Sequence, residues 1–312
     1  MTTIGSSDLD VFPLNLGGNT FGWTSTADES EAVLDAFVAG GGNFIDTADG
    51  YSSWVPGNTG GDSERIIGQW MTRRGNRSDV VVATKVSTHP DFTGLAPANV
   101  LAAADASLGR LGTDHIDLYY AHFDDASVPL VETLAAFDQL VTAGKVRYVG
   151  ISNYSAARVS EWLEIAQREG FALPVALQPH YNLVHREPFE SELAPIVAAH
   201  GLGVMPYYSL ASGFLTGKYR TADDQSKSPR GGGAAAYLNP HGLGVIDALA
   251  GVAESRGVAI ATVALAWLRA QPNLVAPIAS ASRVDQLADL LAAATLDLTA
   301  DEVAALDSAS AV

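Results

Sequence analysis

VVVATKV (80–86) is an unbroken apolar run of strand length that carries a lysine next to its last residue. Strands of a parallel sheet have this pattern because helices cover both of their faces. Seven other short runs of strand character occur along the chain, and several are equally apolar. They are LNLGGN (14–19), NFIDTA (43–48), IDLYYAH (116–122), VRYVGIS (146–152), ALQPHY (176–181), GLGVMPYYS (201–209) and VAPIAS (275–280).

Longer stretches with helical periodicity separate these runs. They cover residues 28–39, 62–73, 97–111, 128–143, 155–169, 191–200, 245–256 and 260–270, and two more follow the last run at 284–293 and 300–308. Ser155 and Thr299 are expected N-caps, and Pro97 suits a first helical turn. Alternating strands and helices predict a parallel sheet, and eight such units predict a closed barrel. We therefore predict an α/β fold, a single (β/α)8 TIM barrel domain over residues 1–312.

An open, doubly wound sheet that binds a dinucleotide is the alternative fold. It requires G-x-G-x-x-G directly after a strand. GLGVID (242–247) has Asp247 where the third glycine belongs, and LNLGGNTFG (14–22) has the wrong spacing. The barrel is therefore favoured.

A long loop is predicted after strand 7, over residues 217–242. Its glycines and prolines predict a segment without regular structure, and loops of this length in compact domains are usually functional or disordered. The loop is locally basic on an acidic protein, through Lys218, Arg220, Lys227 and Arg230.

Composition limits the partners. The 312 residues carry a formal net charge of −17 with no run of Lys or Arg, so we expect no nucleic-acid partner. The absence of cysteine excludes disulfide and thiolate chemistry and fits a reducing cytoplasm. Apolar stretches end well before the ~20 residues of a membrane span, and the first residues do not resemble a signal peptide. We expect a soluble, cytoplasmic protein; the sequence does not indicate its oligomeric state.

Polar side chains stand at the ends of most predicted strands, where a barrel gathers its active site. Asp46 ends the second strand and Tyr51 follows it, Lys85 ends the third, and His122 ends the fourth. The later strand ends carry Ser152, Asn153, Gln178, Tyr207, Ser280 and Ser282.

The first four of these residues support one kind of chemistry. A free phenol has a pKa of ~10, and a nearby ammonium lowers it. Lys85 is predicted to supply that charge to Tyr51, Asp46 to hold and compensate Lys85, and His122 to hydrogen-bond a substrate oxygen. Such a unit would protonate an oxygen on which negative charge develops, a step that typically contributes ~10²–10⁴-fold.

These motifs together resemble one family. FIDTADGYS (44–52), VVATK (81–85), IDLYYAH (116–122), VRYVGISNY (146–154), LQPHYNL (177–183) and PYYSLASGFLTGKY (206–219) are similar, in that order, to the aldo-keto reductases, and GDSERIIG (61–68) is similar to the family's second helix. The similarity runs from about Leu14 to Leu291. It implies an eight-stranded barrel that carries a nicotinamide cofactor, with Asp46, Tyr51, Lys85 and His122 as catalytic tetrad and Tyr51 as general acid.

The resemblance also implies where the cofactor binds. Ser152, Asn153 and Gln178 match residues that hold the carboxamide, and Tyr207 matches the ring that stacks on the nicotinamide. The pyrophosphate loop corresponds to Leu210, Ser212, Gly213, Leu215, Gly217 and Lys218, and Gly18 and Asn19 lie beside the cofactor. PIASASRVDQL (277–287) matches the adenosine end, through Ser280, Ser282, Arg283 and Gln286. Arg283 could pair with a 2′-phosphate, which favours NADP(H) over NAD(H).

Several positions depart from the family pattern. Ser280 stands where glycine is usual, Leu290 where asparagine is frequent, and Tyr208 where serine followed by proline is common. Gly18 and Asn19 replace a commoner Thr-Met pair. These differences affect the expected cofactor affinity and leave the tetrad intact.

The predicted function is NADPH-dependent reduction of an aldehyde or ketone to the alcohol, with Trp23, Trp54 and Phe123 as substrate-pocket residues. The alternative is an NADPH-binding, redox-sensing regulatory subunit with little turnover. A glycosidase would need two carboxylic acids at the scissile bond. A metal hydrolase would need clustered ligands such as H-x-H, so no metal is expected. The physiological substrate and reaction direction are not legible in the sequence.

Overall fold

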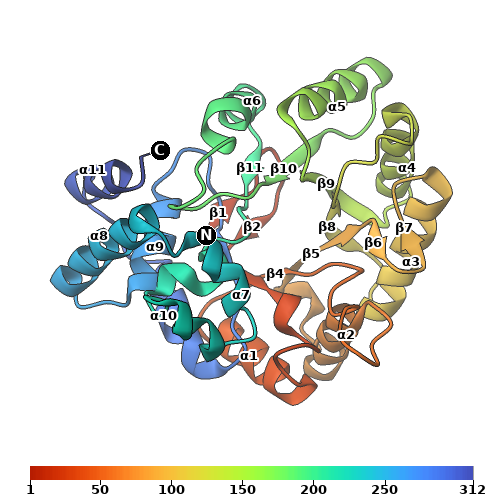
Figure 1. Ribbon diagram of the computed structural model, residues 1–312. Coiled ribbons are helices and arrows are strands. Elements are labelled where there is room, and N and C mark those ends of the chain that lie inside the picture. The colour runs from red at the N-terminus through yellow and green to blue at the C-terminus, as the bar shows by residue number, and fades with distance from the viewer. Residues whose placement is uncertain (312) are drawn as a thin grey trace.

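Eight parallel strands form the centre of the protein, with helices arranged around them (Figure 1). The structure is a computed structural model and describes residues 1–311. The strand order is β11-β10-β9-β8-β5-β4-β3-β12. Hydrogen bonds join the two ends of this order, because Val275 N donates to Val204 O (2.9 Å) and Ile278 N donates to Pro206 O (3.0 Å). The predicted (β/α)8 barrel is confirmed.

The strands of the barrel are short. They are β3 (Asn15–Gly17), β4 (Phe44–Asp46), β5 (Val81–Val86), β8 (Ile116–Ala121), β9 (Val146–Ser152), β10 (Pro174–Gln178), β11 (Gly203–Val204) and β12 (Ile278–Ala279). The predicted seventh and eighth strands were too long, because Pro206 and Pro277 have no N–H for a ladder.

All but one of the α-helices occupy the predicted positions, with some changes at their ends; the exception, α7, was not predicted. They are α1 (Ala27–Ala39), α2 (Asp62–Arg74), α3 (Pro97–Leu111), α4 (Leu130–Thr142), α5 (Ala156–Glu169), α6 (Ala194–His200), α7 (Gly231–Ala234), α8 (Pro240–Arg256), α9 (Ile260–Arg269), α10 (Leu287–Ala292) and α11 (Ala300–Ala309). Ser155 and Thr299 are N-caps as predicted, and Pro97 is in the first turn of α3. The predicted helix 191–200 divides into a π-helical segment, η3 (Phe189–Leu193), and α6.

Residues 217–242 were predicted to lack regular structure, and that prediction is wrong. The segment contains η5 (Ala222–Lys227), α7, η6 (Ala235–Tyr237) and the start of α8. Asp224 orders the first of these turns by accepting hydrogen bonds from the backbone N–H groups of Arg220 and Thr221, both at 2.8 Å. Asn239 caps α8 by accepting from Gly242 N at 2.9 Å. Capping side chains therefore replace the missing apolar periodicity.

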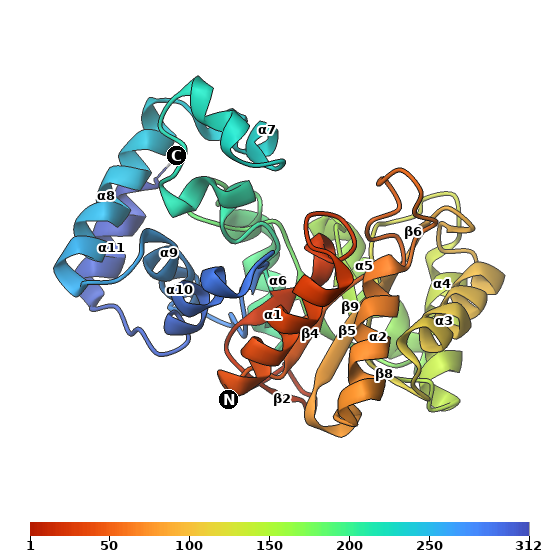
Figure 2. The same cartoon turned by 90° about the horizontal axis from the view of Figure 1, so that it is seen from below.

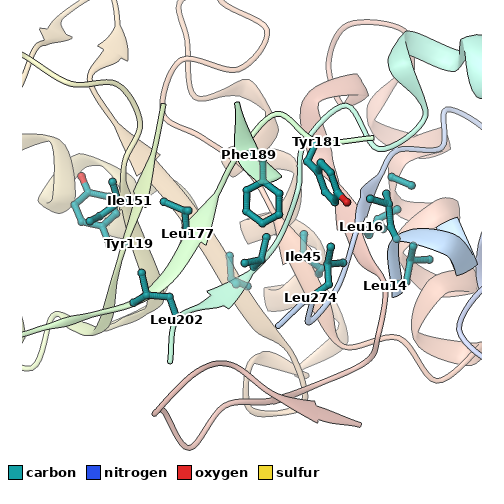
Figure 3. Packing of buried hydrophobic residues seen from close by; sticks show 14 of the residues in the cluster. Leu14, Leu16, Ile45, Tyr119, Ile151, Leu177, Tyr181, Phe189, Leu202 and Leu274 are labelled. Carbon is teal, nitrogen blue, oxygen red and sulfur yellow. The ribbon is translucent and has the colours of Figure 1, made fainter. Parts of the chain in front are cut away.

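Strand alternation separates two hydrophobic cores. On β5, Val82 and Val86 face the helices and join the larger core, part of which is shown in Figure 3. Ala83 joins the smaller core inside the barrel, and Lys85, two residues later, points the same way. Gly150 makes room there for Tyr120, since a Cβ at position 150 would lie 2.4 Å from that ring.

A hairpin that the sequence did not predict fills one end of the barrel. It consists of β1 (Thr2–Thr3) and β2 (Asp10–Val11), and its Ile4, Leu9 and Val11 belong to the interior core. Figure 2 shows β2 and the N-terminus at the end opposite α7 and β6 (Thr88–His89). With that end filled, the cavity of the barrel opens at the carboxyl ends of the strands.

No single helix within residues 1–311 has the length and apolar content to cross a bilayer. Helices α8 and α9 reach that length only as a pair, and they meet at an angle of 99°.

Candidate active site

Three side chains from the ends of β4 and β5 form one hydrogen-bonded unit. The Nζ of Lys85 donates to Asp46 Oδ2 (2.6 Å), to the carbonyl of Thr47 (2.7 Å) and to the hydroxyl of Tyr51 (3.1 Å). Each proton of the ammonium therefore has an acceptor. Lys85 is fully buried and Asp46 is 1% exposed. The structure thus brings together the three residues that the sequence separated by up to 39 positions.

The local chain geometry explains this meeting. Asp46 is the last residue of β4, and Lys85 is the inward-facing residue next to the end of β5. Two successive turns then fold the chain back over these strand ends, because Tyr51 N donates to Ala48 O (3.2 Å) and Ser53 N donates to Gly50 O (3.1 Å). The phenol of Tyr51 is thereby placed above the ammonium.

The electrostatics of the unit keep Tyr51 protonated. Burial lowers the pKa of Lys85, and the carboxylate of Asp46 opposes that shift. Burial, followed by the charge of Asp46, raises the pKa of Tyr51 well above its ordinary value. The prediction that Lys85 lowers this pKa is wrong in its net direction, because burial of the phenol raises the pKa and the charge of Asp46 adds to the rise. The phenol therefore keeps its proton near neutral pH.

His122 stands beside Tyr51, with ring centroids 6.1 Å apart. Burial lowers the pKa of His122 well below its ordinary value, and the charge of Lys85 adds to the shift. Its buried Nδ1 has no hydrogen-bond partner among residues 1–311. A neutral imidazole carries one N–H, so His122 can donate a single hydrogen bond to an oxygen in the cavity.

A chain of hydrogen bonds extends from this unit across the strand ends. Gln178 Nε2 donates to Asp46 Oδ1 (2.8 Å), and the Ser152 hydroxyl donates to the Gln178 carbonyl (2.9 Å). Asn153 Nδ2 donates to Ser152 Oγ (3.1 Å), and the Tyr207 hydroxyl donates to Asn153 Oδ1 (2.7 Å). The chain fixes the polar groups of four strand ends relative to one another.

A cavity of about 1020 Å³ opens above these strand ends. Its walls include Asp46, Tyr51, His122 and all three predicted substrate-pocket residues, Trp23, Trp54 and Phe123. Most predicted cofactor residues also line it: Asn19, Asn153, Gln178, Tyr207, Leu210, Ser212, Gly213, Lys218, Ser280, Ser282 and Gln286. The cavity therefore connects the tetrad with the segment 277–287, where the adenosine end was predicted.

Five predicted cofactor residues do not line the cavity: Gly18, Ser152, Leu215, Gly217 and Arg283. Leu215 is fully buried in the larger core, and Ser152 supports Gln178 from behind. Arg283 is exposed and pairs with Asp285 at 3.0 Å. Sequence position alone could not show that the guanidinium pairs with this nearby carboxylate.

The segment η4 (Ala211–Thr216) bends around the cavity with an unusual backbone. Ala211, Ser212 and Gly213 have φ angles of 47°, 56° and 90°. Non-glycine residues in this region are strained and concentrate at ligand sites. Successive N–H groups in such a bend form a concave anion site. This geometry fits the phosphate-binding role that the sequence predicted for the segment.

Two cationic side chains in the cavity are unpaired within residues 1–311. Every other lysine and arginine has an acidic side chain within 4.0 Å. The two are Lys218 and Arg230, and both line the cavity. Burial lowers the pKa of Arg230. On a protein of net charge −17, two such cations in one cavity indicate an anionic ligand.

Arg230 and Tyr208 were not among the predicted site residues, although both line the cavity. Arg230 belongs to the basic loop identified in the sequence, but its place depends on how η5 and α7 fold back. Tyr208 has φ 52° and lies next to Tyr207, with ring centroids 5.2 Å apart. The only sequence signal for Tyr208 was its departure from the family pattern.

Comparisons with known proteins agree with this geometry. A profile described as Aldo/keto reductase family matches residues 13–311. The chain belongs to the aldo/keto reductase family. Norsolorinic acid reductase B of Aspergillus parasiticus is 33% identical, over 97% of this chain and 82% of that protein. A probable voltage-gated potassium channel subunit beta of Oryza sativa subsp. japonica is 34% identical, over 92% of this chain and 88% of that protein. Protein tas of Escherichia coli is 31% identical, over 97% of this chain and 95% of that protein.

Membership of the aldo/keto reductase family confirms the resemblance found in the sequence and identifies the protein as an oxidoreductase by family. Members of this family generally use NAD(P)H. The relatives include both reductases and channel subunits. Family membership alone therefore does not distinguish a catalytic role from a regulatory one.

Proposed function

We propose that this aldo/keto reductase reduces an aldehyde or ketone to the alcohol with NADPH. The observation that carries the proposal is the Lys85 ammonium, bonded to both the Tyr51 hydroxyl (3.1 Å) and the Asp46 carboxylate (2.6 Å) beneath the cavity. The proposal treats residues 1–312 as one barrel domain, since its strands come from both ends of the chain.

The residues of the cavity fit a nicotinamide dinucleotide. Asn153 and Gln178 offer amide groups beside the Tyr207 ring, which suits a carboxamide and a flat heterocycle. Lys218 and Arg230 supply charge for phosphates, and Ser282 and Gln286 line the far end. When bound, the nicotinamide supplies the hydride.

Tyr51 would protonate the carbonyl oxygen as negative charge develops on it. His122 would donate a hydrogen bond to the same oxygen and orient the substrate. Lys85 would stabilise the phenolate that remains, and Asp46 holds the ammonium in place. Gln178 in turn fixes the second oxygen of Asp46. Each group is in position before the reaction, which reduces the reorganisation that the transition state requires.

Aromatic side chains form the mouth of the proposed substrate pocket. Trp54, Phe123 and Tyr208 are 52%, 47% and 46% exposed, among the few large apolar side chains that reach the surface. Trp23 packs edge-to-face on Trp54 at 5.5 Å, and Phe123 lies 4.7 Å from His122. An exposed apolar cluster at a cavity mouth indicates a ligand surface. It favours carbonyl substrates that carry an aromatic or other flat apolar group.

Trp54→Ala should discriminate between substrate sizes. We expect KM for an aromatic aldehyde to rise about 10-fold, because ring contacts are worth ~0.5–1.5 kcal/mol beyond area burial. KM and kcat for a short aliphatic aldehyde should change by less than about threefold. Steady-state kinetics with both substrates test this, and an equal loss for both would remove Trp54 from the substrate pocket.

The direct test of the proposed function is NADPH oxidation with a panel of aromatic aldehydes, α-diketones and sugar aldehydes. Quenching of protein fluorescence measures NADPH binding in parallel. Turnover with any member supports the proposal and begins to define the substrate. Failure to bind NADPH would exclude both the reductase and the regulatory alternative.

A redox-sensing regulatory subunit is the second candidate, because the Oryza and Arabidopsis relatives are named as potassium channel beta subunits. Two results together would favour the regulatory role: tight binding of NADPH, and turnover of every panel substrate that is slower than exchange of the bound cofactor. Fast multiple turnover would exclude it as the main role.

Arg283→Ala tests the preference for NADP(H). If the guanidinium leaves Asp285 for a 2′-phosphate, its removal should weaken NADPH binding about 10-fold or more and NADH binding hardly at all, since charge-assisted pairs contribute ~1.5–3 kcal/mol. Dissociation constants for both cofactors measure the effect. Equal changes for the two would show that Arg283 stays in its surface pair.

A further inference from the structure

Asp49 is a buried carboxylate that the proposed mechanism does not use. It lies between Asp46 and Tyr51 in the loop after β4 and is 0% exposed. A charged group is costly to bury without partners. A role in forming the turn does not by itself explain why a carboxylate is buried at this position.

Asp49 ties the Tyr51 loop to the chain that follows Lys85. Its backbone N donates to the Lys85 carbonyl (3.1 Å). Its Oδ1 accepts from the Thr88 hydroxyl (3.1 Å), and its Oδ2 accepts from Ser87 N (3.3 Å). Three hydrogen bonds from one residue thus link the two segments that carry the proton donor and its lysine.

The linked segments have little freedom to rearrange. Ser87 has φ 121°, a conformation that L-residues other than glycine rarely adopt. A Cβ at Gly50 would lie 2.4 Å from the Thr88 hydroxyl, so the two loops are in close contact. Strained backbone of this kind persists only where surrounding contacts enforce it. The Asp49 carboxylate provides one of these contacts through its bond to Ser87 N.

Asp49 interacts electrostatically with Lys85 and Tyr51. Glu64 is fully buried nearby and is held by Thr84 (2.5 Å) and Arg110 (2.6 Å). Burial, followed by the charge of Glu64, raises the pKa of Asp49 to about 7, while Thr88, Ser87 and Arg110 oppose the shift. The negative charge of Asp49 favours the charged form of Lys85 and raises the pKa of Tyr51.

We propose that Asp49 is a positioning residue that holds the Tyr51 loop against the strand end of Lys85, and that its negative charge acts on the Tyr51–Lys85 pair. The proposal rests on the proposed function, because it assigns the pair to proton transfer. Asp49 acts through its neighbours and does not touch substrate.

The test compares three variants by the pH dependence of alcohol oxidation, the reverse reaction, which needs Tyr51 deprotonated. Asp49→Asn keeps the shape and removes the charge. The acidic limb of its profile, where activity rises with pH, should move to lower pH by about one unit, because a nearby like charge no longer opposes the phenolate. Thr88→Val removes a hydrogen bond to Asp49 without changing charge, so its limb should stay at the wild-type pH.

Asp49→Ala should lower kcat for carbonyl reduction about 10-fold or more while NADPH affinity stays within about twofold of wild type. Unchanged kcat in Asp49→Ala would overturn the positioning role. An Asp49→Asn limb at the wild-type pH, or an equal shift in Thr88→Val, would overturn the electrostatic role.

A second measurement needs no turnover and separates this proposal from the proposed function. The ultraviolet absorption of the Tyr51 phenolate is obtained by subtracting the titration of Tyr51→Phe. That ionisation should occur at lower pH in Asp49→Asn than in wild type. An identical ionisation in both would refute the coupling even in a protein that reduces no carbonyl, whereas a shift without turnover would contradict only the proposed function.

Discussion

Tyr51→Phe is expected to lower NADPH-dependent carbonyl reduction by about 10²–10⁴-fold, the range typical of a positioned general acid. The variant removes only the hydroxyl that accepts from Lys85 at 3.1 Å. The phenyl ring that remains would keep the edge contact that Tyr51 makes with Trp54, where the ring centroids are 6.4 Å apart. The fold and the cofactor site should therefore persist, and NADPH affinity should stay within about twofold.

The physical reason for the loss is that no other group can replace the phenol. The pKa of His122 is well below its ordinary value, so a charged imidazolium is not available near neutrality. In the variant, Lys85 still donates to Asp46 and Thr47, and it is fully buried and does not line the cavity, so its ammonium cannot reach the carbonyl oxygen. The carbonyl oxygen would then have to take its proton from water.

Tyr154→Phe is the matched control for this prediction, because it removes a second buried phenol that has no hydrogen-bond partner among residues 1–311 and does not line the cavity. Its turnover should stay within about threefold of wild type. Single-turnover kinetics, with NADPH binding measured by fluorescence, compare the two variants. Comparable losses in both, or turnover retained in Tyr51→Phe, would contradict the assignment of Tyr51 as proton donor.

The barrel could be predicted from the sequence because each strand carries its own signal. VVVATKV is apolar on both faces, and period-2 alternation then puts Lys85 on the side of Ala83, inside the barrel. The same argument places Asp46 at the neighbouring strand end. The sequence did not predict the hairpin of β1 and β2 or the early start of α8, because two-residue strands and helix caps leave almost no periodic pattern.

The end of the cavity proposed to bind phosphate was harder to predict, because loop side chains follow no periodicity. Arg283 was assigned from its position at a helix start, but Asp285 two residues later offers it a surface partner. Arg230 was visible only as part of a basic loop, and its place in the cavity depends on turns that Asp224 organises. The direction of the Tyr51 pKa also depends on burial, which no motif encodes.

Lys218→Ala and Arg230→Ala are the second pair of variants with a large expected effect. Arg230→Ala should weaken NADPH binding by about 10²-fold, Lys218→Ala, whose side chain is exposed, by less, and the double variant by more than either. Truncating one member of a desolvated charge pair costs about 2–5 kcal/mol, and each ~1.4 kcal/mol is a factor of ten. Both side chains lack an acidic partner within residues 1–311. A bound anion would therefore be the first negatively charged group to pair with them.

Lys227→Ala is the matched control from the same loop. Its ammonium already pairs with Asp224 at 2.7 Å and is 53% exposed, so NADPH affinity should not change. Titrations with NADPH and NADH then show which phosphate group of the cofactor the two cations contact. Equal losses for both cofactors would place Lys218 and Arg230 on the shared pyrophosphate, whereas a loss for NADPH alone would place them on the 2′-phosphate that Arg283 was predicted to bind. Unchanged affinity in both variants would contradict a phosphate site at this end of the cavity.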